Sequence, residues 1–203
     1  MSSAESKPVL IVIAGPNGSG KTSVTEQILR HEWTEGAVYI NPDIIAQEKF
    51  GDWNSPQAVM QSVRYCEELR EKCLQERRSL IFETVLSRRD KVEYIVRARA
   101  AGFFVRLFFV CTASPTINAA RIAKRVMEGG HDVPITKIIS RYRSSIVNCC
   151  IAAKLVDRCY VYDNSEEGGE ARLLFRASDG SLKKSYGSDI PRWAEFIHQA
   201  VTP

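Results

Sequence analysis

The sequence predicts an α/β fold in three layers, with a mostly parallel central sheet between layers of helices. Short apolar runs alternate with longer segments of helical periodicity, which is typical of parallel sheets covered by helices. The run at 103–110 is nearly all apolar, as expected for a central strand that is covered on both sides. A chain of 203 residues is long enough for one domain with a substantial core.

Each element follows from its local pattern. The expected strands are 9–14, 37–40, 79–83, 103–110 and 156–162, and the expected helices are 21–31, 56–77, 88–101, 115–127, 134–153 and 190–200. Prolines at the start of several of these helices suit a first helical turn. Two short runs, 171–177 and 182–186, flank an Asp-Gly pair, which predicts an edge β-hairpin. We expect a single domain over 1–203, closed by the hairpin and a last helix, with 1–7 flexible.

Composition and charge indicate which ligands and which cellular compartment to expect. The net charge of +4 suits phosphorylated ligands but is too small to indicate nucleic acid, so a nucleic-acid partner is not expected. The sequence has no signal peptide and no run approaching the ~18 apolar residues of a membrane helix, which favours a cytoplasmic protein without membrane contact. Its six cysteines form no C-x-x-C pair, and we interpret the vicinal Cys149 and Cys150 as small apolar fillers rather than a redox switch.

The most informative motif directly follows the first apolar run. Residues 15–22 match G-x-x-x-x-G-K-[ST], and glycines at such positions let consecutive backbone N–H groups point at an anion. The helix that begins near Lys21 adds the positive end of its dipole. We expect ATP and Mg²⁺ here, with Lys21 reaching the β- and γ-phosphates and the Thr22 hydroxyl binding the metal. The predicted nucleotide-binding residues are Gly15, Pro16, Asn17, Gly18, Ser19, Gly20, Lys21 and Thr22.

Two carboxylates follow neighbouring strands. Ligands of open parallel sheets bind beyond the carboxyl ends of the strands, so Asp43 should lie near the γ-phosphate and accept a proton from an acceptor hydroxyl. The alternative for Asp43 is an N-cap of the turn at 44–47. Glu83 could hold a magnesium-bound water or contact the acceptor, or it could be a surface acid at a strand end.

A basic segment follows the fourth strand. Arg121 and Arg125 are four residues apart on one helix face, and Arg141 lies on the next helix, beyond Gly129-Gly130. This arrangement favours an arginine-bearing lid that closes over the phosphates, and a solvated basic face is the alternative. Lys124, Lys137 and Arg143 belong to the same two helices. His131 fits a structural residue of the hinge better than a catalytic base.

Taken together, these motifs resemble the zeta toxin family of P-loop kinases, in its small single-domain branch. The resemblance runs from about residue 8 to 165. It is carried by residues 14–22, by Asn41-Pro42-Asp43, by Phe82-Glu83-Thr84, and most specifically by Arg121-x-x-x-Arg125-Val126-x-x-Gly129-Gly130-His131-x-Val133-Pro134, with Arg141-Tyr142 and Tyr162-Asp163-Asn164-Ser165 extending it.

The resemblance implies an ATP-dependent kinase that phosphorylates a hydroxyl of UDP-N-acetylglucosamine or a related nucleotide sugar. By resemblance, Lys21 stabilises the transferring phosphoryl group, Asp43 is the general base, and Arg125 and Arg141 clamp the phosphates, with Arg121 or Arg143 as substitutes. Glu83 and Thr84 match the acceptor site. Members are often neutralised by a small helical antitoxin that occludes the nucleotide site, which makes an antitoxin a candidate partner.

Other functions remain open at this point. The acceptor could be a nucleoside, another small metabolite or a nucleic-acid end, with fold and loop unchanged. A nucleotide-dependent switch or motor is disfavoured, because the sequence lacks both an Asn-Lys-x-Asp base reader and a Leu-Ser-Gly-Gly-Gln-like signature. A module that holds ATP without transferring phosphate would leave the combination of Asp43 with the arginines unexplained.

Overall fold

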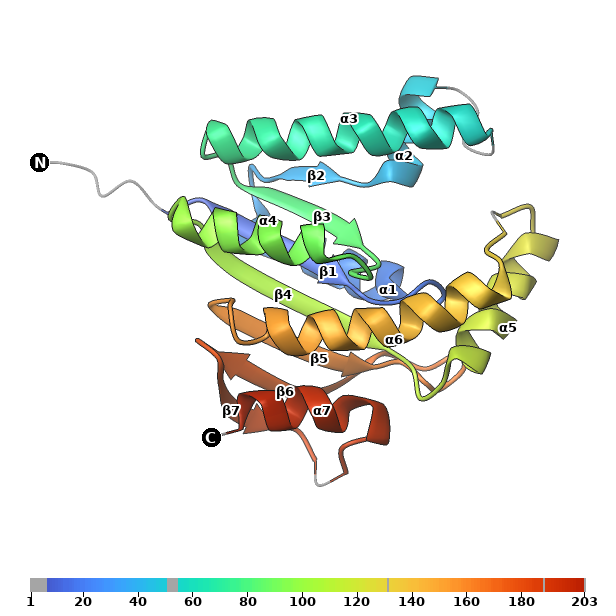
Figure 1. The fold of residues 1–203 in the computed structure, drawn as a ribbon, viewed down its shortest axis with the longest axis vertical. Helices are drawn as coiled ribbons and strands as arrows, with labels where there is room; N and C mark the ends of the chain where they lie inside the picture. The colour runs from blue at the N-terminus through green and yellow to red at the C-terminus, as the bar shows by residue number, and fades with distance from the viewer. Residues whose placement is uncertain (1–6, 51–54, 131, 188, 203) are drawn as a thin grey trace, which may run out of the picture.

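A computed structural model describes residues 7–50, 55–130, 132–187 and 189–202. In this part of the chain, seven strands form one sheet in the order β2-β3-β1-β4-β5-β6-β7 (Figure 1). The strands are β1 (Val9–Ala14), β2 (Val38–Ile40), β3 (Leu80–Thr84), β4 (Phe104–Cys111), β5 (Arg158–Asp163), β6 (Arg172–Ser178) and β7 (Ser181–Ser185). The first five are parallel, and β6 and β7 are antiparallel additions at one edge.

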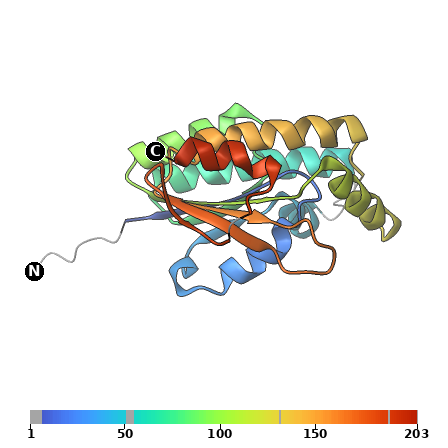
Figure 2. The same ribbon diagram turned by 90° about the horizontal axis from the view of Figure 1, so that it is seen from below.

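The helices form two unequal layers. They are α1 (Lys21–Leu29), α2 (Pro42–Phe50), α3 (Pro56–Gln75), α4 (Arg89–Ala100), α5 (Pro115–Met127), α6 (Ile135–Ala152) and α7 (Arg192–Val201), with a short 3₁₀ turn η1 (Glu32–Thr34). Figure 2 shows α3, α4, α6 and α7 covering one face of the sheet, and α1 lying on the other. The helix α5 projects beyond the end of the sheet (Figure 2). The predicted three-layer αβα fold is thereby confirmed.

The core explains the parallel sheet. Residues 10–14 of β1 are completely buried, and β4 is buried from Leu107 onward except for a small exposed part of Phe108. A strand that is apolar on both faces gains from helices on both sides, since each buried side chain stabilises the fold by about 1.5–3 kcal/mol. All six cysteines are free; Cys149 is buried and Cys150 is half-buried, as expected of apolar fillers.

Some boundaries and one element differ from expectation. The segment after β2, expected as a turn, is the nine-residue helix α2. Pro134 and Pro191 precede their helices as N-cap residues instead of lying in the first turn. The hairpin is confirmed: Asp179 and Gly180 both adopt positive φ, 48° and 73°, between β6 and β7.

Two expectations fall on residues outside the described ranges. They concern the flexibility of the first six residues and the role of His131. Within those ranges, no helix combines the length and the apolar character that crossing a membrane requires.

Candidate functional site

The predicted phosphate-binding loop lies between β1 and α1, at the carboxyl edge of the parallel strands. Gly18 and Gly20 have φ of 74° and 82°, the left-handed region that favours glycine. A methyl group at Gly15 would lie 2.0 Å from the carbonyl oxygen of Val110, and the Gly15 N–H donates to the carbonyl of Thr84 at 3.2 Å. The glycines therefore permit a tightly curled backbone that passes close to two neighbouring strand ends.

Two buried asparagines hold this loop from outside. The Asn118 amide, on α5, donates to the carbonyl of Asn17 at 2.7 Å, and the Asn164 amide, after β5, donates to the carbonyl of Ser19 at 2.9 Å. The backbone of Asn118 also packs so closely on Gly18 that a Cβ there would lie 2.6 Å from its carbonyl oxygen. The curled loop is thus fixed by side chains that come from distant parts of the sequence.

Lys21 lies at the start of α1 and reaches back over the loop. Its Nζ donates to the carbonyls of Gly15 and Pro16 at 3.0 and 3.2 Å. Burial lowers the pKa of the Lys21 ammonium, while the Glu83 carboxylate opposes that shift. The nearby Arg125 lowers this pKa further. The ammonium is therefore buried among charges of both signs, and a bound anion would stabilise its charged form.

Glu83 ends β3 and is fixed through one oxygen. The Tyr39 hydroxyl donates to Glu83 Oε1 at 2.6 Å, and the Asn41 amide lies 3.4 Å from the same oxygen. The Thr25 hydroxyl, on α1, lies 3.0 Å from Oε1. Because these contacts converge on Oε1, the second carboxylate oxygen keeps its capacity to accept a hydrogen bond from a ligand or a bound water. The side chain of Thr84 turns instead to its own loop, where it accepts from the Leu86 N–H at 3.0 Å.

Asp43 lies in the first turn of α2. The alternative role considered for it, capping this segment, is taken by Asn41, whose Oδ1 accepts from the Asp43 N–H at 2.9 Å. The Asp43 carboxylate is exposed, and no hydrogen bond to it occurs among the described residues. It is close enough to Lys21 to raise the pKa of the ammonium. The side chain is therefore available for a ligand.

The predicted arginines have different surroundings. Arg141 Nη1 donates to the Asn17 side chain at 3.2 Å, which places its guanidinium over the loop. Arg121 donates to the carbonyls of Asn164 and Glu166 at 2.8 and 3.0 Å, so it binds the segment after β5. Arg125 makes no side-chain hydrogen bond among the described residues and lies near Lys21.

One cavity of about 600 Å³ brings most of these side chains together. The predicted site residues that line it are Asn17, Gly18, Gly20, Lys21, Thr22, Asp43, Glu83, Thr84, Arg121, Arg125 and Arg141. Gly15, Pro16 and Ser19 belong to the loop but do not line the cavity, and neither do Lys124, Lys137 or Arg143. Seven cationic side chains and three carboxylates line it, so the cavity is suited to polyanionic ligands.

Sequence reasoning missed several residues of this site. Asn118, Asn164, Tyr39 and Thr25 act on the loop or on Glu83 through contacts between distant segments. Of these four, only Asn164 stood in a motif of the family resemblance, and no role was assigned to it there. Its position shortly after the expected strand at 156–162, where ligands of parallel sheets bind, was a usable signal.

The fold and this loop are those of the P-loop class of nucleotide-binding proteins. A family model described as Zeta toxin matches residues 1–169, and the chain therefore belongs to the zeta toxin family. Family membership and the kinase fold support an ATP-dependent kinase. No curated protein sequence matches the chain.

Solved structures of low sequence identity share the fold. A chain of the AvrRxo1-ORF1:-ORF2 complex with ATP superposes with a TM-score of 0.67 at 18% identity, over 98% of this chain and 64% of that one. This chain thus spans less than two thirds of the AvrRxo1 relative. The PezAT toxin-antitoxin system of Streptococcus pneumoniae gives 0.60 at 14% identity, over 98% and 80%. A putative kinase from Chloroflexus aurantiacus gives 0.51 at 20% identity, over 67% and 80%.

The loop geometry predicts the effect of Gly15→Ala. The added methyl group would collide with the Val110 carbonyl, which lies in the buried carboxyl-terminal half of β4 and cannot move freely. We expect a loss of about 2 kcal/mol, a Tm lower by roughly 4–8 °C, and weaker binding of an ATP analogue. Gly169→Ala is the control, because its Cβ would meet only ordinary contacts beginning at 3.4 Å. A Gly15→Ala protein that melts and binds like the parent chain would contradict the assigned loop geometry.

Proposed function

We propose that this chain is an ATP- and Mg²⁺-dependent kinase that transfers the γ-phosphate of ATP to a hydroxyl of a nucleotide sugar such as UDP-N-acetylglucosamine. The observation that carries the proposal is that one cavity is lined by Lys21, by Asp43, whose carboxylate accepts no hydrogen bond from the described residues, and by two arginines from separate helices, Arg125 and Arg141. Phosphoryl transfer needs these parts together: a phosphate cradle, a proton acceptor and cationic groups around the moving phosphoryl group.

The residues present fit the nucleotide and its metal. The loop is curled at positive-φ glycines whose added Cβ atoms would strike neighbouring groups. Its Gly15 and Ser19 N–H groups donate to backbone carbonyls, and the N–H groups of Gly18 and Gly20 would be available to phosphate oxygens. The Thr22 hydroxyl lines the cavity and would bind Mg²⁺. When bound, Mg²⁺ neutralises phosphate charge. Glu83, whose second oxygen accepts no hydrogen bond from the part of the chain that the structure describes, would hold a water of the metal shell or contact the acceptor.

The proposed phosphoryl transfer forms one bond to the γ-phosphorus and breaks another. The acceptor hydroxyl oxygen attacks the γ-phosphorus, its proton passes to Asp43, and the bond between the γ-phosphorus and the bridging oxygen breaks to release ADP. Lys21, Arg125 and Arg141 stabilise the negative charge on the transferring group. Lys21 would exchange its contacts with the loop carbonyls for contacts with phosphate oxygens. Arg121, which binds backbone carbonyls, is assigned to positioning the nearby segment after β5.

A protein partner belongs to the same proposal. The PezAT structure is of a toxin-antitoxin system, and the AvrRxo1 structure is of an ORF1:ORF2 complex. An antitoxin-like protein that covers the cavity would block both nucleotide and acceptor, and its presence would be seen as loss of ATP binding in a reconstituted complex.

The direct test is a transfer assay with labelled ATP, Mg²⁺ and a panel of acceptors. The panel contains nucleotide sugars, nucleosides, simple sugars and nucleic-acid ends. We expect ADP formation that depends on a nucleotide sugar, with the label recovered on that acceptor. Transfer to a different class would keep the kinase and replace the acceptor. Tight ATP binding with no transfer to any acceptor would identify a binding module instead.

A further inference from the structure

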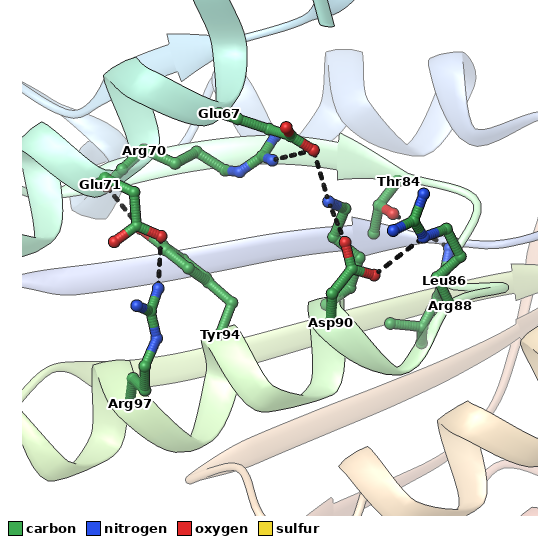
Figure 3. Close-up of polar contacts among 10 residues, drawn as sticks. Glu67, Arg70, Glu71, Thr84, Leu86, Arg88, Asp90, Tyr94 and Arg97 are labelled. Atoms are coloured by element: carbon green, nitrogen blue, oxygen red, sulfur yellow. Dashed lines mark hydrogen bonds and ion pairs between the residues drawn. The ribbon is translucent and has the colours of Figure 1, made fainter. Parts of the chain in front are cut away.

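One arm of the cavity lies away from the phosphate-binding loop, between α3 and the start of α4. Three cationic side chains line it: Lys91 within α4, and Arg70 from α3 and Arg88 just before α4, the last two labelled in Figure 3. Two carboxylates alternate with them, as Lys91 Nζ lies 3.3 Å from Glu67 Oε1 and 3.0 Å from Asp90 Oδ2. Arg88 Nε lies 3.5 Å from Asp90 Oδ1. The series has one more cation than carboxylates.

Arg70 is the unusual member of this series. Only 9% of its side chain is exposed, and its guanidinium lies 5.1 Å from the centre of the Phe82 ring. The nearest carboxylate oxygen, Glu67 Oε1, is 3.7 Å from Nη2, beyond hydrogen-bond distance. Among the described residues, the guanidinium donates no hydrogen bond. Buried polar groups are nearly always hydrogen-bonded, so a buried cation with free donors on a cavity wall points to a ligand that supplies the acceptors.

The Arg70 guanidinium is not needed to hold α3 and α4 together, because another arginine does so. The same two helices are joined by an ion pair and hydrogen bond between Arg97 of α4 and Glu71 of α3 (Figure 3). Arg97 is half-exposed and does not line the cavity. The Tyr94 hydroxyl adds a further connection between α3 and α4, because it donates to the Arg70 carbonyl at 2.8 Å. Joining the helices therefore does not require the charge of Arg70.

We propose that this arm binds an oxyanion, a phosphate or carboxylate group carried by the acceptor, through Arg70 and Lys91. The proposal rests on the proposed kinase function, since it places the anionic end of the acceptor. Successive strand residues point to opposite faces, so Phe82, under Arg70, and Glu83, beside Lys21, face different sides of β3. The acceptor would thus extend from the carboxyl edge of the sheet, where its hydroxyl meets the γ-phosphate, into the space beneath α3.

The chemistry of the arm suits such a group. A guanidinium offers paired donors to two oxygens of a phosphate or carboxylate, and Lys91 adds a compact charge. Glu67 faces the same space and can accept from a hydroxyl of the ligand. The neighbouring Cys66 contributes a neutral thiol, because burial raises its pKa to about 11.

The test follows the backbone amide signals of α3 and α4 by NMR, which every variant keeps, while inorganic phosphate or acetate is titrated into the full chain saturated with AMP-PNP and Mg²⁺. We expect saturable binding of at least one of the two anions. The anion should bind at least about tenfold more weakly to Arg70→Met, because this variant keeps the packing on Phe82 but lacks the hydrogen-bond donors of the guanidinium. Lys91→Gln should weaken binding as well. Arg97→Met is the matched control, because Arg97 lies on α4 but outside the arm. This variant should bind the anion as tightly as the parent chain does.

The outcomes separate this inference from the proposed function. Unsaturable shifts for both anions, or equal binding by the parent chain and both arm variants, would overturn the anion site. Failure to bind AMP-PNP would count against the proposed kinase, while the arm can still be titrated without nucleotide. Thermal melts check that each variant is folded. With an identified acceptor, Arg70→Met should raise KM for that acceptor and leave KM for ATP unchanged.

Discussion

Replacing Lys21 by alanine should lower phosphoryl transfer by about 10²-fold or more, the cost typical of losing a preorganised charge at a reacting group. In the free protein its ammonium is held by the carbonyls of Gly15 and Pro16, close to where the phosphates are proposed to bind. Its charge is favoured by Glu83 and disfavoured by burial and Arg125, so a bound triphosphate would relieve an unfavourable environment. Single-turnover rates with saturating ATP measure the effect.

The matched control for Lys21→Ala is Lys49→Ala. Lys49 lies on α2 with its ammonium 4.6 Å from the centre of the Tyr65 ring, and it does not line the cavity. Removing that charge should leave transfer unchanged within about twofold. If the Lys21 variant turned over at a near-normal rate while folded, the ammonium would have no role at the transferring phosphoryl group.

Replacing Asp43 by alanine or asparagine should abolish measurable transfer, a loss of about 10²–10⁴-fold, while ATP binding stays within a few-fold of normal. The structure makes this variant informative, because Asn41 rather than Asp43 caps α2. The helix keeps its cap when the carboxylate is removed. A rate loss can then be assigned to the lost proton acceptor, and equilibrium binding of an ATP analogue checks that the cradle is intact.

Glu48→Gln provides the comparison for Asp43. Glu48 is an exposed carboxylate on the same helix and lies outside the cavity, so its neutralisation should change neither binding nor transfer. Unaltered transfer by a correctly folded Asp43 variant would remove the general-base assignment and leave the proton to solvent or to another group such as Glu83.

Local patterns were enough for the fold and for much of the cavity. The parallel strands follow from apolar runs such as β4, and the loop at 15–22 follows from its glycines, because both signals are contained in a few consecutive residues. The edge hairpin was equally local, since Asp179-Gly180 adopts the positive φ that its turn needs. Asp43, Glu83 and Arg141 line one cavity, as expected from their positions after strands and on the basic helices.

The remaining features depend on contacts between distant residues. Asn118 and Asn17 are 101 positions apart, and Asn164 and Ser19 are 145 apart, so no local pattern could reveal these hydrogen bonds. The helix α2 was missed because its nine residues carry little amphipathic periodicity and read as a turn after Asn-Pro. Nothing in the local pattern singles out Arg70, because only the packing of α3 on β3 shows that its side chain is buried.

The hydrogen bonds of Arg121 limit how the arginine-bearing helices can rearrange. Its guanidinium fastens the middle of α5 to the carbonyls of Asn164 and Glu166, and Asn118, one turn earlier, fastens the same helix to the phosphate-binding loop. Swinging α5 as a whole would break both attachments. If these helices close over a substrate as the lid hypothesis expects, the movement would be confined to the chain beyond Arg121, which contains Arg125 and the Gly129-Gly130 junction, while the nucleotide end would stay in place.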